Sequence, residues 1–307
     1  MIRSEYLKKG DQVAIVSTAR KISLEEIEPA IALLKSWGLK ANVGKTIGAA
    51  ENQLAGSDAL RISDFQIMLD NPEIKAIWCA RGGYGTVRII DHLDFTEFKK
   101  HPKWIVGYSD VTVLHSHVHN LGYETIHAEM AMEIAKKTSL TRSSLRNALF
   151  GKLDTLKYHL QDTSSRKGIA KGQLSGGNLS VLYSLCGSVS AIDTKGKILF
   201  IEDLDEYLYH IDRMMQNMKR NGYFEQLAGL IVGGMSDMRD NTEAFGFKAD
   251  NPFGKTAKEI IAEAVSEYDF PVCYDFPAGH MENNIALIMG SEVKLEVQAS
   301  KVILTYK

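Results

Sequence analysis

The first half of the chain alternates short apolar runs with amphipathic segments, and this alternation constrains its fold more than any other feature. Apolar runs typical of buried strands lie at 12–17, 39–43, 75–80 and 103–107. Segments with apolar residues at helical spacing lie between and after them, at 23–37, 57–70, 86–93 and 110–122. Strands that alternate with helices and are apolar along their length predict a doubly wound α/β domain, with a mostly parallel sheet covered on both faces.

The second half is more mixed. Strand-like runs lie at 172–177, 197–203, 227–234 and 270–276. Helical segments lie at 178–186, 206–219 and 254–268, and residues 286–307 alternate as β-hairpins do. The polar cluster at 162–168 is the best candidate for a linker. We therefore predict an N-terminal α/β domain at 1–150, a linker at 151–168, and a C-terminal mixed α+β domain at 169–307.

Composition excludes several classes of partner. The formal net charge of the 307 residues is -2, which leaves no basic surplus for nucleic acid and no polybasic patch for a membrane surface. No stretch approaches the roughly 20 apolar residues of a membrane span, and the apolar run near the N-terminus is too short for a secretory signal. The three scattered cysteines, Cys79, Cys186 and Cys273, indicate reduced thiols and a cytoplasmic protein.

Ligands of parallel α/β sheets collect where a strand ends and the next helix begins. The junction ARGGYGTVR (80–88) has three glycines within four positions, so its backbone amides are open to a ligand. Its spacing matches neither the dinucleotide fingerprint nor the phosphate loop. The pattern favours a loop that binds an anion or oxyanion, with an ordinary tight turn as the alternative.

A second junction places one hydroxyl between an apolar strand and a helix. Gly107-Tyr108-Ser109-Asp110 has the layout of a nucleophile elbow, and the amide of Asp110 is a candidate oxyanion donor. The usual elbow is G-x-S-x-G, whereas Val111 stands in place of its second glycine. The alternative is that Ser109 or Asp110 simply caps the helix.

A serine nucleophile needs a base, and the chain has nine histidines. His115 and His119 have the i, i+4 spacing of metal ligands but no H-E-x-x-H motif, so we predict a solvated helix face. His127 could line a site or belong to the core. His280 lies in a loop with proline and glycine directly after a strand, where it could reach into a cleft.

A catalytic histidine also needs a carboxylate to orient it, and the end of a strand is a place for one. Glu202 follows the apolar strand residues 197–201, where hydrophobic patterning does not account for a carboxylate, although a capping role is an equal alternative. Asp203, Asp205 and Glu206 are predicted to cap or charge the helix that follows.

Five segments together resemble a known family. ARGGYG, GYSD, SGGNLSVL, FIEDLDEYLYHIDRM and PAGHMENN occur in the order seen in the LD-carboxypeptidase family of serine peptidases, a group of murein tetrapeptide carboxypeptidases and microcin C immunity peptidases. The resemblance covers essentially the whole chain. It implies a doubly wound α/β domain joined to a C-terminal mixed domain, with the active site in a cleft between them.

The resemblance also implies roles for individual residues. Ser109 would be the nucleophile, Glu202 the orienting carboxylate and His280 the general base, and the amides of Gly83 and Asp110 would form the oxyanion hole. Members resemble cytoplasmic enzymes of cell-wall recycling that cut the terminal D-alanine from a murein tetrapeptide, use no metal and no cofactor, and are often homodimers.

The substrate's terminal carboxylate needs a cationic or amide-rich pocket. Arg81, beside the glycine-rich loop, is a candidate because the fork of a guanidinium matches a carboxylate.

Two departures bear on the substrate. Members often carry His-Gly-Pro where this chain has His127-Ala128-Glu129, so Glu129 could alter substrate contacts or merely face solvent. The microcin C immunity peptidases insert a loop with a tryptophan after the GGNL segment, and this chain does not. That favours a murein peptide over a nucleotidyl peptide. The alternatives are a microcin C-type immunity peptidase and a non-catalytic ligand-binding homologue.

Overall fold

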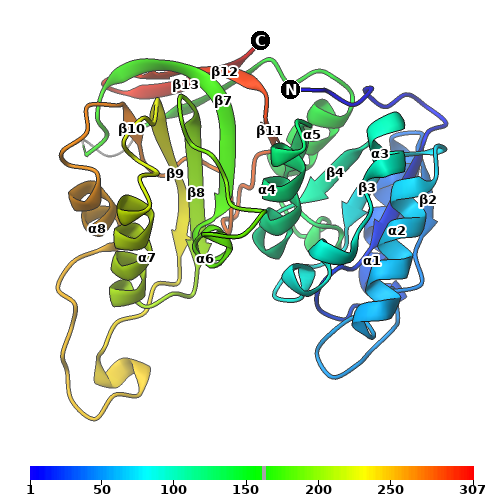
Figure 1. The fold of residues 1–307 in the computed structure, drawn as a ribbon, viewed down its shortest axis with the longest axis horizontal. Coiled ribbons are helices and arrows are strands. Elements are labelled where there is room, and N and C mark those ends of the chain that lie inside the picture. Colours follow the sequence, from blue (N-terminus) through cyan, green and yellow to red (C-terminus); the bar gives the residue numbers. More distant parts are fainter. Residues whose placement is uncertain (161–163) are drawn as a thin grey trace. The chain divides into compact units, whose positions relative to one another are not determined.

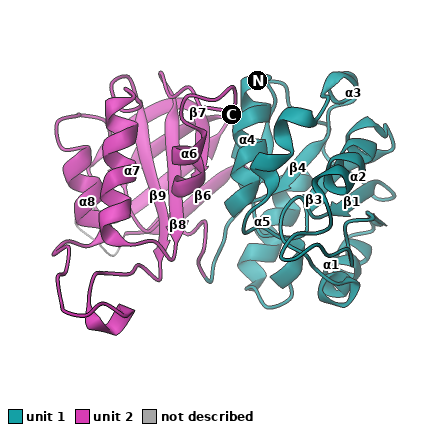
Figure 2. Cartoon of the chain, turned by 60° about the horizontal axis from the view of Figure 1, so that its bottom comes forward, with its two compact units in different colours: residues 1–153, 282–291 teal, residues 154–281, 292–307 magenta. Residues whose placement is uncertain are grey.

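The computed structural model describes residues 1–160 and 164–307 and divides into two compact units. Unit 1 comprises Met1–Leu153 and Glu282–Ser291, and unit 2 comprises Asp154–Met281 and Glu292–Lys307 (Figure 2). Each unit has its own sheet with helices packed on it (Figure 1). The predicted fold class, a doubly wound domain followed by a mixed one, is confirmed.

The sheet of unit 1 has the strand order β11-β5-β4-β3-β1-β2. Its strands are β1 (Gln12–Val16), β2 (Lys40–Val43), β3 (Ile74–Cys79), β4 (Trp104–Gly107), β5 (Thr125–His127) and β11 (Leu287–Met289). The first five are parallel, and β11 pairs with β5 in the antiparallel direction. The order 2-1-3-4-5 reverses between β1 and β3, which makes that point the topological switch of a doubly wound sheet.

The helices of unit 1 are α1 (Leu24–Ser36), α2 (Asp58–Asp70), α3 (Thr96–Lys100), α4 (Thr112–Asn120) and α5 (Ser139–Leu149), with 3-10 turns η1 (Thr86–Arg88), η2 (Ile90–His92), η3 (Ser109–Val111) and η4 (Ala131–Glu133). Three of the four helical segments predicted in unit 1 are α-helices, and α3 and α5 lie outside the predicted segments. Ser23 and Glu26 form a capping box at the start of α1. The helix predicted at 86–93 is instead the pair η1 and η2. The β-branched Val87, Ile89 and Ile90 crowd this short segment and lower its helix propensity.

The sheet of unit 2 is half parallel and half antiparallel, in the order β10-β9-β8-β7-β12-β13-β6. Its strands are β6 (Thr155–His159), β7 (Gly168–Asn178), β8 (Ile198–Leu204), β9 (Gly229–Ser236), β10 (Val272–Cys273), β12 (Glu292–Val297) and β13 (Lys301–Tyr306). β7 to β10 are parallel, whereas β7, β12, β13 and β6 pair in the antiparallel direction. The hairpin predicted near the end of the chain is β12–β13.

Three helices cover the parallel half of this sheet: α6 (Leu179–Leu185), α7 (Leu208–Arg220) and α8 (Ala257–Ala264). A 3-10 turn, η5 (Glu243–Phe245), lies in the long connection between β9 and α8. α7 buries Ile211, Met214, Met215 and Met218 at i, i+3, i+4 and i+7, the stripe that packs a helix onto a sheet.

The three cysteines are free. Burial raises the pKa of both Cys79 and Cys273 to about 12, so these thiols are held in the protonated form at neutral pH.

The observed units differ from the predicted boundaries in two ways. β6 lies within the predicted linker 151–168, where it pairs with β13. Residues 282–291 belong with unit 1 because β11 pairs with β5. Alternation along the chain predicts that a segment is a strand, but it does not say which strand it will pair with. Residues 161–163 of the predicted linker lie outside the described residues.

Candidate functional site

The predicted nucleophile lies on a tight turn between β4 and α4 in unit 1. Ser109 has φ +61°, a conformation that a non-glycine residue keeps only where its surroundings fix it. A Cβ atom at Gly107 would lie 2.8 Å from Cγ2 of Val111, so the strand and the helix meet too closely for a side chain there. Ser109 is half-buried, whereas its neighbours Tyr108 and Asp110 are buried. This geometry is that of a nucleophile elbow.

Asp110 ties the elbow to the glycine-rich loop. Its Oδ2 accepts a hydrogen bond of 2.9 Å from the backbone amide of Thr86. Burial raises the pKa of the Asp110 carboxyl group, and the hydrogen bonds from Thr86 oppose that rise. Neither η3 nor α4 has a side-chain hydrogen bond at its N-cap, so the alternative in which Ser109 or Asp110 merely caps the helix is wrong.

The glycine-rich loop packs directly against Ser109. A Cβ atom at Gly82 would lie 3.3 Å from Oγ of Ser109 and 3.2 Å from Cε of Met130. The next residue, Gly83, has φ +105°, which only glycine adopts readily. The two predicted oxyanion donors, the amides of Gly83 and Asp110, therefore belong to segments that meet beside this hydroxyl.

A buried arginine anchors the far end of the same loop. Nη1 of Arg61, on α2, donates to the carbonyl oxygens of Thr18 at 2.6 Å and Gly85 at 2.9 Å, and Nη2 bonds the carboxylate of Asp58. Burial lowers the pKa of Arg61, and Asp58 opposes that fall. Sequence reasoning missed this residue because an arginine on an amphipathic helix is expected at the surface.

Arg81, the predicted carboxylate ligand, is turned toward the start of α1. Its Nη1 donates to the carbonyl oxygen of Lys21 at 3.1 Å and lies 3.8 Å from Oε1 of Glu26. The guanidinium thus already has an acceptor and a carboxylate within its own unit.

Glu202 and His280 come together in unit 2, although 78 residues separate them. Oε2 of Glu202, a fully buried residue of β8, accepts hydrogen bonds from Nδ1 of His280 at 2.6 Å and from its backbone amide at 3.0 Å. The φ of Gly279 is +98°, and a Cβ atom there would lie 2.6 Å from the same carboxylate oxygen. The hydroxyl of Ser236 donates to the carbonyl oxygen of His280. A carboxylate that binds both the ring and the backbone of a histidine fixes its orientation.

The acids next to Glu202 do not all charge the following helix as predicted. Asp203 is buried and bonds the preceding helix, α6, through the backbone amide of Ser180 at 2.8 Å and Nδ2 of Asn178 at 2.8 Å. Burial, and then the charge of Glu202, raise the pKa of Asp203 to about 7. The prediction for Asp203 is wrong because β7 and β8 are neighbours, which brings the start of α6 to the end of β8.

The histidines of α4 form no solvated face. His115 and His119 are both buried, and His115 bonds Oγ1 of Thr125 through Nδ1 and the carbonyl oxygen of Gly107 through Nε2, each at 2.8 Å. Burial, and then the neighbouring His127, lower the pKa of His115 to about 3, so its ring is neutral. His127 is likewise buried, on β5. Among the described residues, no group of three or more histidine, cysteine and carboxylate side chains is arranged to hold a metal ion.

Glu129 does not face solvent. It is buried, 3.3 Å from Nζ of Lys137 and 3.3 Å from Nδ2 of Asn284. Its Oε1 accepts a hydrogen bond of 3.2 Å from the amide of Met130, the residue that contacts the glycine-rich loop. Burial raises the pKa of Glu129, and Lys137 opposes that rise.

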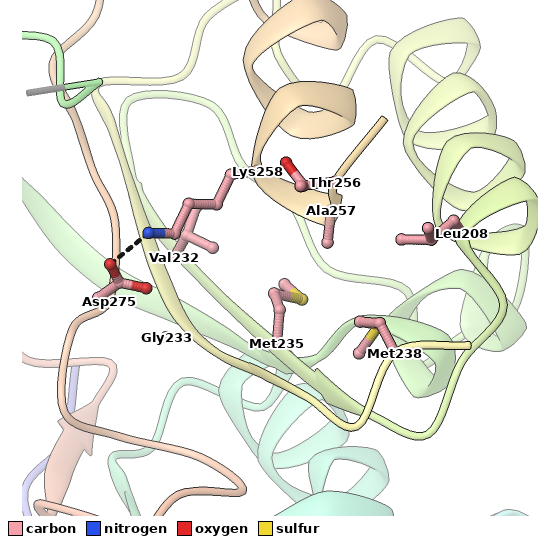
Figure 3. A pocket seen from close by; sticks show the side chains of 9 residues that line it. All are labelled: Leu208, Val232, Gly233, Met235, Met238, Thr256, Ala257, Lys258 and Asp275. Carbon is pink, nitrogen blue, oxygen red and sulfur yellow. Dashed lines mark hydrogen bonds and ion pairs between the residues drawn. The ribbon is translucent and has the colours of Figure 1, made fainter. Parts of the chain in front are cut away.

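A pocket of about 430 Å³ lies in unit 2, between β9 and the N-terminal ends of α7 and α8 (Figure 3). Its lining residues are Leu208, Val232, Gly233, Met235, Met238, Thr256, Ala257, Lys258 and Asp275. Lys258 and Asp275 form an ion pair at one end, and methionine side chains lie at the other (Figure 3). None of the three predicted catalytic residues lines this pocket.

Comparison with known proteins shows the family. Residues 13–128 match the LD-carboxypeptidase N-terminal domain, and residues 171–295 match the LD-carboxypeptidase C-terminal domain. The chain belongs to the LD-carboxypeptidase family. The resemblance predicted from the five sequence segments is thereby confirmed.

Relatives in this peptidase family match the chain nearly from end to end. A probable murein peptide carboxypeptidase of Bacillus subtilis is 33% identical over 298 residues, which cover 95% of this chain and 91% of that protein. The murein tetrapeptide carboxypeptidase of Pseudomonas aeruginosa is 26% identical, and the match covers 93% of each chain.

Solved structures of LD-carboxypeptidase relatives share the fold. The muramoyltetrapeptide carboxypeptidase of Oxalobacter formigenes superposes with a TM-score of 0.84 at 24% identity and covers 96% of this chain and 98% of its own. The microcin C7 self immunity protein MccF, in complex with aspartyl sulfamoyl adenosine, has a TM-score of 0.87 at 20% identity, covering 100% and 99%. Within its described residues, this family member has no helix that is both long and apolar enough to cross a membrane.

Proposed function

We propose that this protein is a serine-type LD-carboxypeptidase that removes the terminal D-alanine from murein tetrapeptides. The hydrogen-bonded pair of the buried Glu202 and the partly buried His280 carries the proposal. A carboxylate removed from water and bound at 2.6 Å to one imidazole nitrogen is the arrangement that orients a general base. The elbow at Ser109 supports it from the other unit, and the names of the Bacillus and Pseudomonas relatives point to a murein peptide.

The proposed chemistry is acyl transfer through a covalent intermediate. Nδ1 of His280 stays on Glu202, so Nε2 takes the proton of the Ser109 hydroxyl as Oγ attacks the scissile carbonyl carbon. The oxyanion that forms is stabilised by the backbone amides of Gly83 and Asp110. His280 then returns the proton to the departing amine of D-alanine as the C–N bond breaks. Water attacks the ester, gives a proton to His280, and releases the shortened peptide while Oγ recovers its hydrogen.

The deciding experiment is the release of D-alanine from a murein tetrapeptide by wild type and Ser109→Ala. We expect turnover to fall by about 10⁴- to 10⁶-fold, because the covalent route is lost while the peptide still binds. Ser63→Ala, an exposed serine of α2, is the matched control and should keep wild-type turnover. Near-wild-type activity in Ser109→Ala would refute the assignment of the nucleophile.

Assays on the same purified proteins distinguish two other functions from the proposed one. A non-catalytic ligand-binding homologue would release no D-alanine, would not be labelled at Ser109 by a fluorophosphonate, and would lose only about 10- to 100-fold in affinity on Ser109→Ala. A microcin C-type immunity peptidase would cleave an aminoacyl sulfamoyl adenosine faster than the tetrapeptide. The direct run from β7 into α6, without a tryptophan before β8, favours the murein peptide.

The family also leads us to propose a cytoplasmic homodimer that needs neither metal nor cofactor. Light scattering should then give twice the mass of one chain, and activity should survive a chelator. Cell fractionation should place the protein with the cytoplasmic enzymes.

A further inference from the structure

We propose that Arg20, in the loop that follows β1, binds a carboxylate of the substrate beside Ser109 and is a specificity-determining residue. This inference rests on the proposed function, because it requires a peptide substrate with a free carboxylate near the scissile bond. Murein tetrapeptides satisfy this requirement, since the bond to be cut joins the terminal residue to the rest of the peptide.

The place of Arg20 in the fold is where a doubly wound sheet binds its ligands. The strand order of unit 1 reverses between β1 and β3, and ligands of such sheets lie outside the carboxyl ends of the strands at that point. Arg20 follows β1, and the glycine-rich loop follows β3. These two loops therefore form the switch-point edge of unit 1.

Backbone contacts hold Arg20 in this loop. The hydroxyl of Ser17 donates to the carbonyl oxygen of Arg20 at 2.7 Å, and the amide of Arg20 lies 3.5 Å from the carbonyl oxygen of Gly82. Arg20 also forms an antiparallel bridge with Leu54. The backbone that carries the Arg20 side chain is therefore held in place by contacts within unit 1.

The side chain of Arg20 lies along the candidate oxyanion loop. A Cβ atom at Gly83 would lie 2.6 Å from both Cδ and Nε of Arg20. The preceding residue, Gly82, touches Ser109 in the same way. The path from the guanidinium to the hydroxyl thus consists of these two contacts and the one peptide unit between Gly83 and Gly82. Its length is at most about four residue lengths, at roughly 3.3–3.6 Å per residue. This distance is an upper limit, and a carboxylate one or two residues from the scissile bond reaches about 3–7 Å along it.

The charge of Arg20 is available for a ligand, in contrast to that of Arg81. Arg20 is exposed, and within the described residues its guanidinium has neither an ion pair nor a hydrogen bond. Arg81 has Glu26 and the carbonyl oxygen of Lys21 as partners. An unpaired guanidinium held beside a reacting group binds a planar carboxylate through two parallel hydrogen bonds.

The test compares peptides that differ only in one carboxylate. Wild type and Arg20→Ala are assayed on a murein tetrapeptide, on the same peptide with a C-terminal carboxamide, and on one whose internal carboxylate is amidated. We expect Arg20→Ala to lower kcat/KM on the tetrapeptide by about 10- to 100-fold, mainly through KM, as for the loss of a charged hydrogen bond. It should have no effect on the peptide that lacks the carboxylate Arg20 binds, which identifies that carboxylate as terminal or internal.

Two variants make the result specific. Arg20→Lys keeps the charge but not the fork and should restore part of the discrimination. Lys21→Ala removes an exposed cation one residue away and should leave the discrimination between peptides intact. An equal loss on all three peptides in Arg20→Ala, or loss of discrimination in Arg81→Ala instead, would overturn the assignment.

Failure of this inference is distinct from failure of the proposed function. If wild type releases nothing from any of the peptides, the proposed function is wrong. If wild type turns them over and Arg20→Ala does so with unchanged kcat/KM, only the role of Arg20 is refuted.

Discussion

The two units hold their candidate catalytic groups by different means. In unit 1, the backbone fixes Ser109, through a positive φ and through glycines at 82 and 107 whose missing side chains let neighbouring segments close in. In unit 2, a side chain fixes His280, because the buried carboxylate of Glu202 binds both its ring and its amide. A group held by backbone should be sensitive to added atoms, and a group held by a buried carboxylate should be sensitive to a lost charge.

Of these two kinds of support, the lost charge should have the larger effect. In Glu202→Gln, the amide would present a donor to Nδ1 of His280 and favour the wrong imidazole tautomer, so we expect kcat to fall by about 10³- to 10⁴-fold. The measurement is D-alanine release at saturating tetrapeptide.

Unit 2 offers a matched control for this change. Oε2 of Glu206 also lies 2.6 Å from Nδ1 of a histidine, His210, but both side chains are partly exposed, at 22% and 27%. Glu206→Gln should change kcat by less than about threefold, because a solvated pair contributes little. Similar losses in both variants would mean that burial of the carboxylate is not what matters.

The corresponding test in unit 1 adds one carbon atom. Gly82→Ala places a Cβ atom 3.3 Å from Oγ of Ser109, so we expect kcat to fall by about 10- to 100-fold as the hydroxyl is displaced. Gly229→Ala is the control, since its Cβ atom would be equally crowded, 3.2 Å from Cβ of Ala170, but on β9 in unit 2. We expect both variants to shift the melting temperature by a similar amount and only Gly82→Ala to lose activity. That result would show that the backbone geometry at Ser109 is required for turnover.

The candidate catalytic residues of both units carry a clearer signal in the sequence than the residues that support them. Ser109, Glu202 and His280 each follow or end an apolar strand, where a polar residue has no role in the core, and five motifs in order then predicted their roles. Arg20 carries no such signal, because its contact with Gly83 depends on the φ of that glycine and on the path of the loop after β1. The residues next to Arg20 in the sequence determine neither that φ nor the path of the loop.

Hydrophobic patterning also could not predict which polar residues are buried. His115 and His119 at i, i+4 predict a polar helix face, yet both are buried, and the hydrogen-bond partners of His115 lie on β4 and β5. The strand β11 likewise could be predicted to exist, but its partner in unit 1 depends on a contact across more than 150 residues. Long-range pairing of this kind is fixed by the complete fold.

A smaller effect, on stability, is expected at Glu129. Glu129→Ala would remove an acceptor from Lys137, Asn284 and the amide of Met130, and we expect the free energy of unfolding to fall by about 2–3 kcal/mol. Glu129→Gln keeps an acceptor and should lose less than half as much. Urea unfolding of the two variants measures the difference. An equal and small loss in both would show that the buried carboxylate is not a support of unit 1.

The last effect concerns how the stability of unit 1 near the elbow depends on pH. His115 holds the carbonyl oxygen of Gly107, two residues before Ser109, and its pKa is lowered to about 3 by burial. Between that value and the ordinary 6.5, the unfolded chain binds a proton that the folded chain does not, so the stability present above pH 6.5 is lost as the pH falls. The expected slope is about 1.4 kcal/mol per pH unit. Urea unfolding between pH 6.5 and 4.5 should show a slope that is lower by this amount in His115→Gln than in wild type, whereas His159→Gln, an exposed histidine of unit 2, should keep the wild-type slope. An unchanged slope in His115→Gln would mean that the acid sensitivity of the chain arises away from the Ser109 backbone.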